Sequence, residues 1–177
     1  MSMRAEISST LSNNSEDLGS RTSAQGLFNY ADSYLGSAHE LRAANSDVPF
    51  AEEPVRFLLY HAAELHLKAF LRASGMTIDE LKAKGHKFSK LTAAAQEIGL
   101  GLDAQYVDTL IYGEETGDVM SVRYIITGYR KWIDTPTIAL CAGHIRRAVR
   151  THQNRVGHIV LRGEGSGIID DRWELGM

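Results

Sequence analysis

The chain has 177 residues, of which 44% are hydrophobic and 23% are charged, and its formal net charge is -3. This length and apolar content suit one domain with a hydrophobic core, which excludes disorder throughout the chain. The single cysteine, Cys141, excludes an internal disulfide and a zinc site built on paired cysteines. No apolar run approaches the roughly 20 residues of a membrane helix, and residues 1–20 lack a signal-peptide pattern, so we expect a cytoplasmic protein without membrane contact.

Positive charge is concentrated in the last third of the chain. Residues 119–163 contain eight basic residues and one acidic residue, whereas residues 99–118 contain five acidic residues and no basic one. A basic segment of this kind attracts phosphate or nucleic acid. The alternative is that the acidic and basic helices face each other, within the fold or across a dimer.

The first part of the chain predicts an arm followed by two helices. Residues 1–22 are rich in serine and lack apolar periodicity, which predicts a flexible arm. From residue 23 apolar residues recur at three- and four-residue steps, which predicts an amphipathic helix ending near Asn45. A second helix is predicted from Pro54 to a left-handed cap at Gly75. It is apolar on most sides and is therefore expected in the middle of a bundle. Only a narrow strip stays polar, formed by His61, Glu64, Lys68 and Arg72.

Three further helices are predicted in the middle of the chain. Thr77 and Glu80 form a capping box for a short helix. The next helix is expected to be capped near Ser89, and the third is expected to cover residues 103–115. In the third helix, Glu114 falls at the negative end, where a carboxylate is unfavourable.

The remaining elements are a bend and a final helix. Residues 119–132 contain β-branched residues but no second strand is visible to pair with them, which favours a helical or irregular bend. The final helix is expected to be capped by Asp134 or Thr135, with Pro136 in its first turn. Cys141 belongs to its apolar stripe, so we interpret this thiol as a core residue rather than a nucleophile.

These elements together predict an all-α fold. Residues 23–157 are expected to form an antiparallel bundle of four or five main helices. Residues 158–177 contain four glycines and are predicted to be a loosely ordered tail.

The sequence predicts neither a metal site nor a cofactor. His61 and His66 lie on one helix but roughly 140° apart around its axis, so they cannot jointly hold a metal, and the HExxH spacing is absent. His66 lies on the apolar face and is interpreted as a hydrogen-bonded core residue. The glycines of the tail follow no strand, so they do not predict a phosphate-binding loop.

One block of the sequence resembles a known family. FLLYHAAELHLKAFLRASG, followed by GHKFSKL, resembles the HEPN domains (higher eukaryotes and prokaryotes nucleotide-binding). Their pattern is an apolar helix with a glutamate and a Lys-Ala pair, then a histidine that opens a helix. The matching residues are Glu64, Lys68, Ala69 and His86. Arg123 and Tyr124 resemble the arginine-tyrosine pair that often follows the third helix of these domains.

The resemblance implies a helical bundle that commonly dimerises. It further implies either a metal-independent ribonuclease or a noncatalytic module associated with RNA or nucleotides, often beside a minimal nucleotidyltransferase in toxin-antitoxin systems. Nuclease members carry an arginine shortly before a histidine near the last helix, and Arg147 or Arg146 before His152 fits that spacing. In such a pair His152 would move a proton and Arg147 would neutralise charge developing on the phosphate.

The leading hypothesis is a homodimeric HEPN-like protein that binds RNA or a nucleotide phosphate through its basic final helix. Its expected ligand-binding residues are Glu64, Lys68, His86, Arg123, Tyr124, Arg146 and Arg150. Two alternatives stay open. The chain could be a metal-independent endoribonuclease that uses Arg147 and His152, or a noncatalytic partner of a nucleotidyltransferase.

Overall fold

The computed structural model of the protein describes residues 22–44, 47–124 and 131–155, and every regular element in these ranges is a helix. The all-α prediction is therefore confirmed. The predicted N-terminal arm, except for its last residue, and the predicted C-terminal tail lie outside the described residues.

The described residues form seven helices, five of which have ten residues or more. In chain order they are α2 (Ala24–Ala43), α3 (Glu52–Ala73), α4 (Ile78–Lys84), α5 (Phe88–Glu97), α6 (Ala104–Glu115), α7 (Asp118–Ser121) and α8 (Thr135–Arg155). The two short helices are α4, which the capping box predicted, and α7, which lies in the predicted bend.

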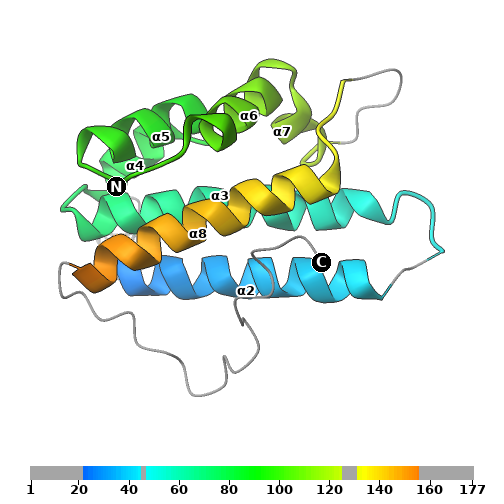
Figure 1. Ribbon diagram of the computed structural model, residues 1–177, viewed down its shortest axis with the longest axis horizontal. Coiled ribbons are helices and arrows are strands. Elements are labelled where there is room, and N and C mark those ends of the chain that lie inside the picture. Colours follow the sequence, from blue (N-terminus) through cyan, green and yellow to red (C-terminus); the bar gives the residue numbers. More distant parts are fainter. Residues whose placement is uncertain (1–21, 45–46, 125–130, 156–177) are drawn as a thin grey trace, which may run out of the picture.

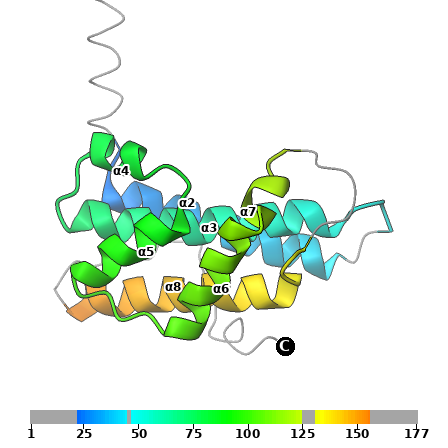
Figure 2. The same ribbon diagram turned by 90° about the horizontal axis from the view of Figure 1, so that it is seen from above.

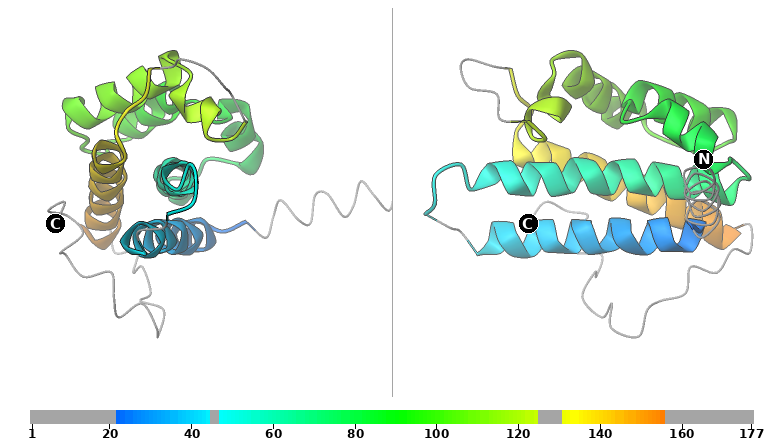
Figure 3. Two further views of the ribbon diagram at one scale, coloured as in Figure 1. Left: turned by 90° about the vertical axis from the view of Figure 1, so that its right-hand side faces the viewer. Right: turned by 180° about the vertical axis from the view of Figure 1, so that it is seen from behind.

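Helix α3 is the central element, as its apolar faces predicted. α2 runs antiparallel beside it, and α4 to α7 return the chain to the end at which α3 begins, so α8 runs in the same direction as α3 (Figure 1). Figure 2 shows α4 to α7 lying across the other helices. In the end-on view of Figure 3, α3 lies inside the ring that its neighbours form. Twelve of its residues are buried, among them Glu64, which belongs to the strip predicted to stay polar.

Local capping interactions explain where three of the described helices begin and where α3 ends. The Ser23 hydroxyl accepts a hydrogen bond from the backbone N–H of Gly26 at 3.0 Å and caps α2. The capping box of Thr77 at α4 is present as predicted. Gly75 follows α3 with a φ of 99°, which is the left-handed geometry predicted for it. Asp134 accepts from the backbone N–H of Thr137 at 2.9 Å and caps the first turn of α8.

The start of α5 and the position of Glu114 differ from the prediction. Helix α5 begins at Phe88, and its N-cap residue Lys87 makes no side-chain cap. Ser89 lies inside the first turn, where its backbone N–H donates to the Glu114 carboxylate at 3.0 Å. A carboxylate is favourable at this positive helix end. The apparently misplaced Glu114 of α6 therefore supplies the cap that α5 lacks in its own sequence.

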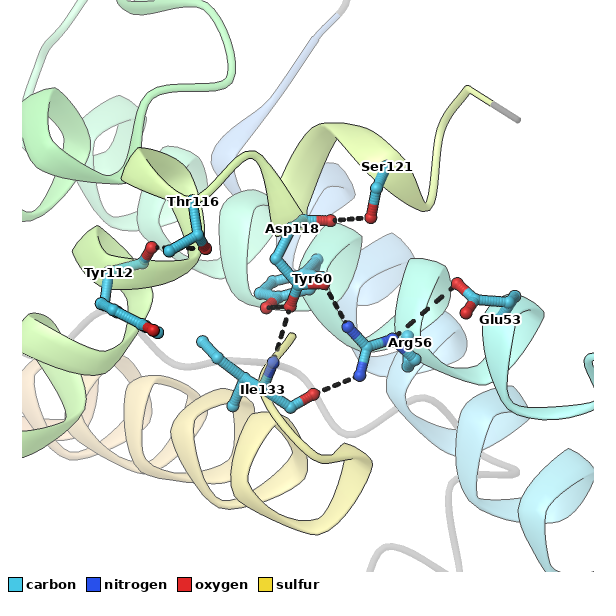
Figure 4. A network of polar contacts seen from close by, with 8 residues as sticks. All are labelled: Glu53, Arg56, Tyr60, Tyr112, Thr116, Asp118, Ser121 and Ile133. Atoms are coloured by element: carbon cyan, nitrogen blue, oxygen red, sulfur yellow. Dashed lines mark hydrogen bonds and ion pairs between the residues drawn. The ribbon is translucent and has the colours of Figure 1, made fainter. Parts of the chain in front are cut away.

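A buried polar network attaches α7 and the start of α8 to the central helix (Figure 4). The Asp118 carboxylate is an ion-pair partner of Arg56 and accepts hydrogen bonds from the Tyr60 hydroxyl at 2.7 Å and the backbone N–H of Ile133 at 3.2 Å. Arg56 also donates to the carbonyl of Ile133. Asp118, Arg56 and Tyr60 are all at most 1% exposed. Residues 119–121 of the predicted bend are thus helical, and the polar network attaches their helix to α3.

Replacement of Asp118 tests this network. The variant Asp118→Asn leaves the buried Arg56 guanidinium with only the more distant Glu53 carboxylate, at 3.9 Å, as counter-charge, which costs about 3 kcal/mol of unfolding free energy. We expect that loss in urea denaturation.

The matched control is Asp79→Asn, because the Asp79 side chain is 91% exposed and pairs with Lys82 only at the surface. This change is expected to leave the urea midpoint unaltered. Equal losses in the two variants would contradict a stabilising role for the buried pair.

Candidate anion-binding site around Glu64

Three separate segments meet at the polar strip of α3. Glu64 and Lys68 lie one helical turn apart on α3. His86 comes from the connection between α4 and α5, and Arg123 comes from the turn after α7. The structure therefore brings together Glu64, Lys68, His86 and Arg123, four of the residues predicted from the family resemblance, and we call them the Glu64 cluster.

The carboxylate of Glu64 is the centre of this cluster. It accepts from Lys68 Nζ at 2.7 Å and from an Arg123 Nη at 2.8 Å, and His86 Nδ1 lies 2.9 Å from both of its oxygens. The Glu64 side chain is 2% exposed, whereas those of Lys68 and Arg123 are 15% and 14% exposed and that of His86 is 52% exposed. The acid is thus buried beneath cationic groups that reach the surface.

Glu64 is held in its ionised form by these neighbours. Burial raises the pKa of the carboxyl group. The hydrogen bonds and positive charges of Lys68 and His86 lower the pKa by more than burial raises it, so the net pKa lies below the ordinary value. One carboxylate therefore faces one ammonium and one guanidinium group, and the cluster carries an excess positive charge even when His86 is neutral.

The cationic groups keep donors that Glu64 does not use. An ammonium group has three protons and Glu64 accepts one from Lys68. Arg123 Nε is buried and has no hydrogen-bond partner among the described residues. The Arg123 guanidinium group also lies 5.5 Å from the centroid of the Phe57 ring. Positive charge with unused, partly desolvated donors is the arrangement that favours an oxyanion such as phosphate.

His61 is the residue of this region that the sequence interpretation missed as part of a site. Its ring stacks on Phe57 with centroids 5.7 Å apart and meets the edge of Tyr34 at 4.6 Å. Burial lowers the pKa of His61. The negative charge of Glu64 raises it, and the positive charges of Arg123 and Lys68 lower it again. The net pKa lies below the ordinary value, so the imidazole is neutral at pH 7. The sequence signal for including His61 in the site was its spacing from Glu64 and Lys68, because positions 61, 64 and 68 share one helix face.

The arginine and tyrosine predicted beside these residues have different surroundings. Arg146 makes a two-point ion pair with Asp32 of α2, at 2.8 and 3.2 Å, so its guanidinium group already has a carboxylate partner. Asp32 also lies 2.9 Å from His66 Nε2, and His66 is fully buried, which confirms its interpretation as a core residue. Tyr124 follows Arg123 in the chain and its side chain is 63% exposed.

The proposed catalytic pair lies on α8, apart from the Glu64 cluster. Arg147 is exposed and Arg150 is half-buried. His152 packs edge-on against Phe70 with ring centroids 4.9 Å apart, and its Nδ1 lies 3.3 Å from an Arg155 Nη. Residues five apart on a straight helix lie about 140° apart around its axis, which directs Arg147 and His152 to different sides of α8.

Helix α8 and the Glu64 cluster occupy different sides of α3. Phe70, which contacts α8 through His152, lies about 120° from Glu64 around the α3 axis. The end-on view shows α8 along one side of α3 (Figure 3). A small ligand therefore cannot contact Glu64 cluster residues and His152 at once.

No family model, curated protein or solved structure matches this chain. Within residues 22–44, 47–124 and 131–155, no group of three or more His, Cys, Asp or Glu side chains could hold a metal ion. The helices described there include none with the length and apolar character to cross a membrane. The chemistry of the site therefore has to be inferred from its own geometry.

Replacement of Glu64 tests whether the cluster depends on an ionised acid. Glu64→Gln removes the charge that pairs with Lys68 and Arg123, and we expect a loss of about 2 kcal/mol of unfolding free energy near pH 7. Because the folded pKa of Glu64 is depressed, its contribution is present above the ordinary value of 4.5 and is lost as the pH falls through the folded pKa. The difference between wild type and variant should therefore shrink in acid.

The control for this experiment is Glu97→Gln, since Glu97 is an exposed residue at the end of α5. Urea titrations of all three proteins between pH 7 and pH 3 give the comparison. A difference for Glu64→Gln that stays constant through this range would contradict the ionised state.

Proposed function

We propose that this chain is a HEPN-like helical protein that binds a phosphate group of RNA or of a nucleotide. The observation that carries the proposal is the meeting of Glu64, Lys68, His86 and Arg123 around one buried carboxylate. His86 and Arg123 lie 22 and 59 positions from Glu64 in the sequence, and all four residues are among those on which the family resemblance rests. Homodimerisation and a role beside a nucleotidyltransferase in a toxin-antitoxin system belong to the same proposal and rest on the resemblance alone.

The different roles of the acid and the cations in the cluster support phosphate as the ligand. Glu64 fixes Lys68 and Arg123 in place from below, which reduces the rotamer entropy that these long side chains lose on binding. The protons of Lys68 that Glu64 does not accept remain available to an oxyanion. Since both side chains are mostly buried, their charges are screened less than those of exposed residues. Phosphate would contact the cations while staying away from the Glu64 oxygens beneath them.

This proposal moves the primary phosphate site away from the basic final helix. Arg146 is paired with Asp32, so of the two residues of α8 predicted as ligands only the half-buried Arg150, on another side of α3, is assigned to RNA. We assign Arg150 a secondary contact along an RNA long enough to pass around the molecule. A single nucleotide would contact the Glu64 cluster alone.

Binding of single-stranded RNA against salt concentration tests the primary site. Each phosphate contact contributes about -0.7 to the slope of log affinity against log salt for a single strand. We expect Lys68→Met to weaken binding about tenfold and to make the slope shallower by about 0.7, as measured by fluorescence anisotropy between 50 and 200 mM salt.

The matched control is Lys90→Met, because Lys90 is exposed on α5. It removes the same charge from the chain without touching Glu64. Equal effects of the two variants, or an affinity of the wild type that does not change with salt, would refute the phosphate site.

A second candidate function is metal-independent RNA cleavage, and the setting of His86 favours it. Glu64 binds His86 at Nδ1, and the ring is half exposed, so Nε2 is the nitrogen that can face a ligand. A histidine oriented by a carboxylate is the usual form of a general base. In this reaction Nε2 takes the proton of a 2′-hydroxyl, the 2′-oxygen attacks phosphorus, and the 5′-oxygen leaves and is protonated by water. Lys68 and Arg123 would stabilise the added negative charge.

Cleavage of a structured RNA in the presence of a chelator tests whether His86 or His152 is the catalytic base. If His86 is the base, His86→Ala should lower the rate at least about a hundredfold while His152→Ala stays near wild type. The reverse result would support the Arg147 and His152 pair instead. No cleavage by the wild-type protein would leave phosphate binding without catalysis.

A further inference from the structure

A cavity of about 350 Å³ lies between α2 and α3, next to the Glu64 cluster. Its walls include Leu27, Tyr30 and Tyr34 from α2, and His61 and Leu65 from α3. This volume is within the range of cavities that hold small molecules. It opens on the part of α3 that carries the polar strip, since His61 belongs both to the strip and to the cavity wall.

Three of the eight residues that line this cavity carry aromatic rings, namely Tyr30, Tyr34 and His61. Tyr30 is 67% exposed, so its ring is accessible, and Tyr34 meets His61 edge to face. Phe57 contacts the His61 ring in a stacked arrangement with an interplanar angle of 11°. Planar rings held in fixed positions are suited to stack on another planar ring, and stacking of a nucleobase on an aromatic side chain is worth about 1–3 kcal/mol.

The cavity and the cationic cluster adjoin along one helix. Leu65 of the wall and Lys68 of the cluster are three residues apart on α3, an axial rise of about 4.5 Å. The start of α2 is held against α3 by Arg72, whose Nε donates to the carbonyl of Thr22 at 3.2 Å. The α3 side of the cavity and the anion site are therefore neighbours along one helix.

We infer that the cavity binds the base of the nucleotide whose phosphate lies on Lys68 and Arg123. The preferred ligand is then a nucleoside monophosphate unit with an unpaired base, as in single-stranded RNA. Paired bases of a duplex are stacked inside the helix and cannot enter the cavity. This inference rests on the proposed function, because it requires phosphate at the Glu64 cluster.

Titration of the full-length protein with three ligands tests the inference. The ligands are inorganic phosphate, ribose 5-phosphate and adenosine 5′-monophosphate, and calorimetry measures the affinity for each. We expect the adenosine nucleotide to bind at least about fivefold more tightly than ribose 5-phosphate, which is the lower limit of one base stacked on a side chain. Tyr30→Ala should remove this preference without changing the affinity for ribose 5-phosphate.

Two further variants make the result decisive. Tyr112→Ala is the matched control, since Tyr112 is an exposed tyrosine on α6, and it should retain the preference. Tyr34→Leu keeps an apolar side chain in the wall and should weaken the preference as Tyr30→Ala does. Lys68→Met should lower the affinity for all three ligands by the same factor.

The possible failures are distinguishable. If ribose 5-phosphate and the nucleotide bind equally, and both are weakened by Lys68→Met, the base site is overturned while the phosphate site stands. If the preference survives Tyr30→Ala and Tyr34→Leu, the base binds elsewhere and the cavity assignment is wrong. If none of the three ligands binds, the proposed function and this inference both fail.

Discussion

The burial of one carboxylate, that of Glu64, is the constraint on which the candidate site depends. A buried carboxylate without partners is costly, so the fold has to bring cationic groups to it. Lys68 comes from the same helix, whereas His86 and Arg123 come from segments that cover α3. The pairing gives more positive than negative charge, because a single acid holds two permanent cations. The same interaction that stabilises the enclosed helix therefore leaves a cationic surface capable of binding an anion.

The second buried acid, Asp118, explains how Arg123 reaches this position. Asp118 is anchored to α3 through Arg56 and Tyr60 and to the segment before α8 through Ile133. Its partners are buried and face inward, so this network has a structural role. It fixes α7 on the central helix, and Arg123 follows within five residues. The two carboxylates thus differ in the exposure of their partners: the Arg56 and Tyr60 side chains that bind Asp118 are buried, whereas the cations that bind Glu64 reach solvent.

The positive charge of the last third of the chain is used in part inside the fold. Arg146 neutralises Asp32, which also binds the buried His66, and Arg123 neutralises Glu64. These two arginines thus pair with carboxylates of α2 and α3 and not with the acidic segment 99–118. The two pairs differ in their consequences, because the Arg146 pair joins α8 to α2 as a structural contact, whereas Lys68 of the Glu64 cluster keeps protons that Glu64 does not accept. Charge counted along the sequence does not distinguish these cases.

The sequence alone determined the elements of this protein. Helix starts at Ser23 and Thr77, the stop at Gly75 and the central position of α3 could all be predicted, because caps and apolar periodicity act between residues a few positions apart. The resemblance to the HEPN pattern also singled out Glu64 and its partners from the sequence. Only the tertiary structure decided that Arg123 pairs with Glu64 across 59 positions, that Glu114 caps a different helix, and that tyrosines of α2 line one cavity with His61 of α3. Those contacts depend on how helices pack, and packing geometry between distant segments leaves no local pattern in one sequence.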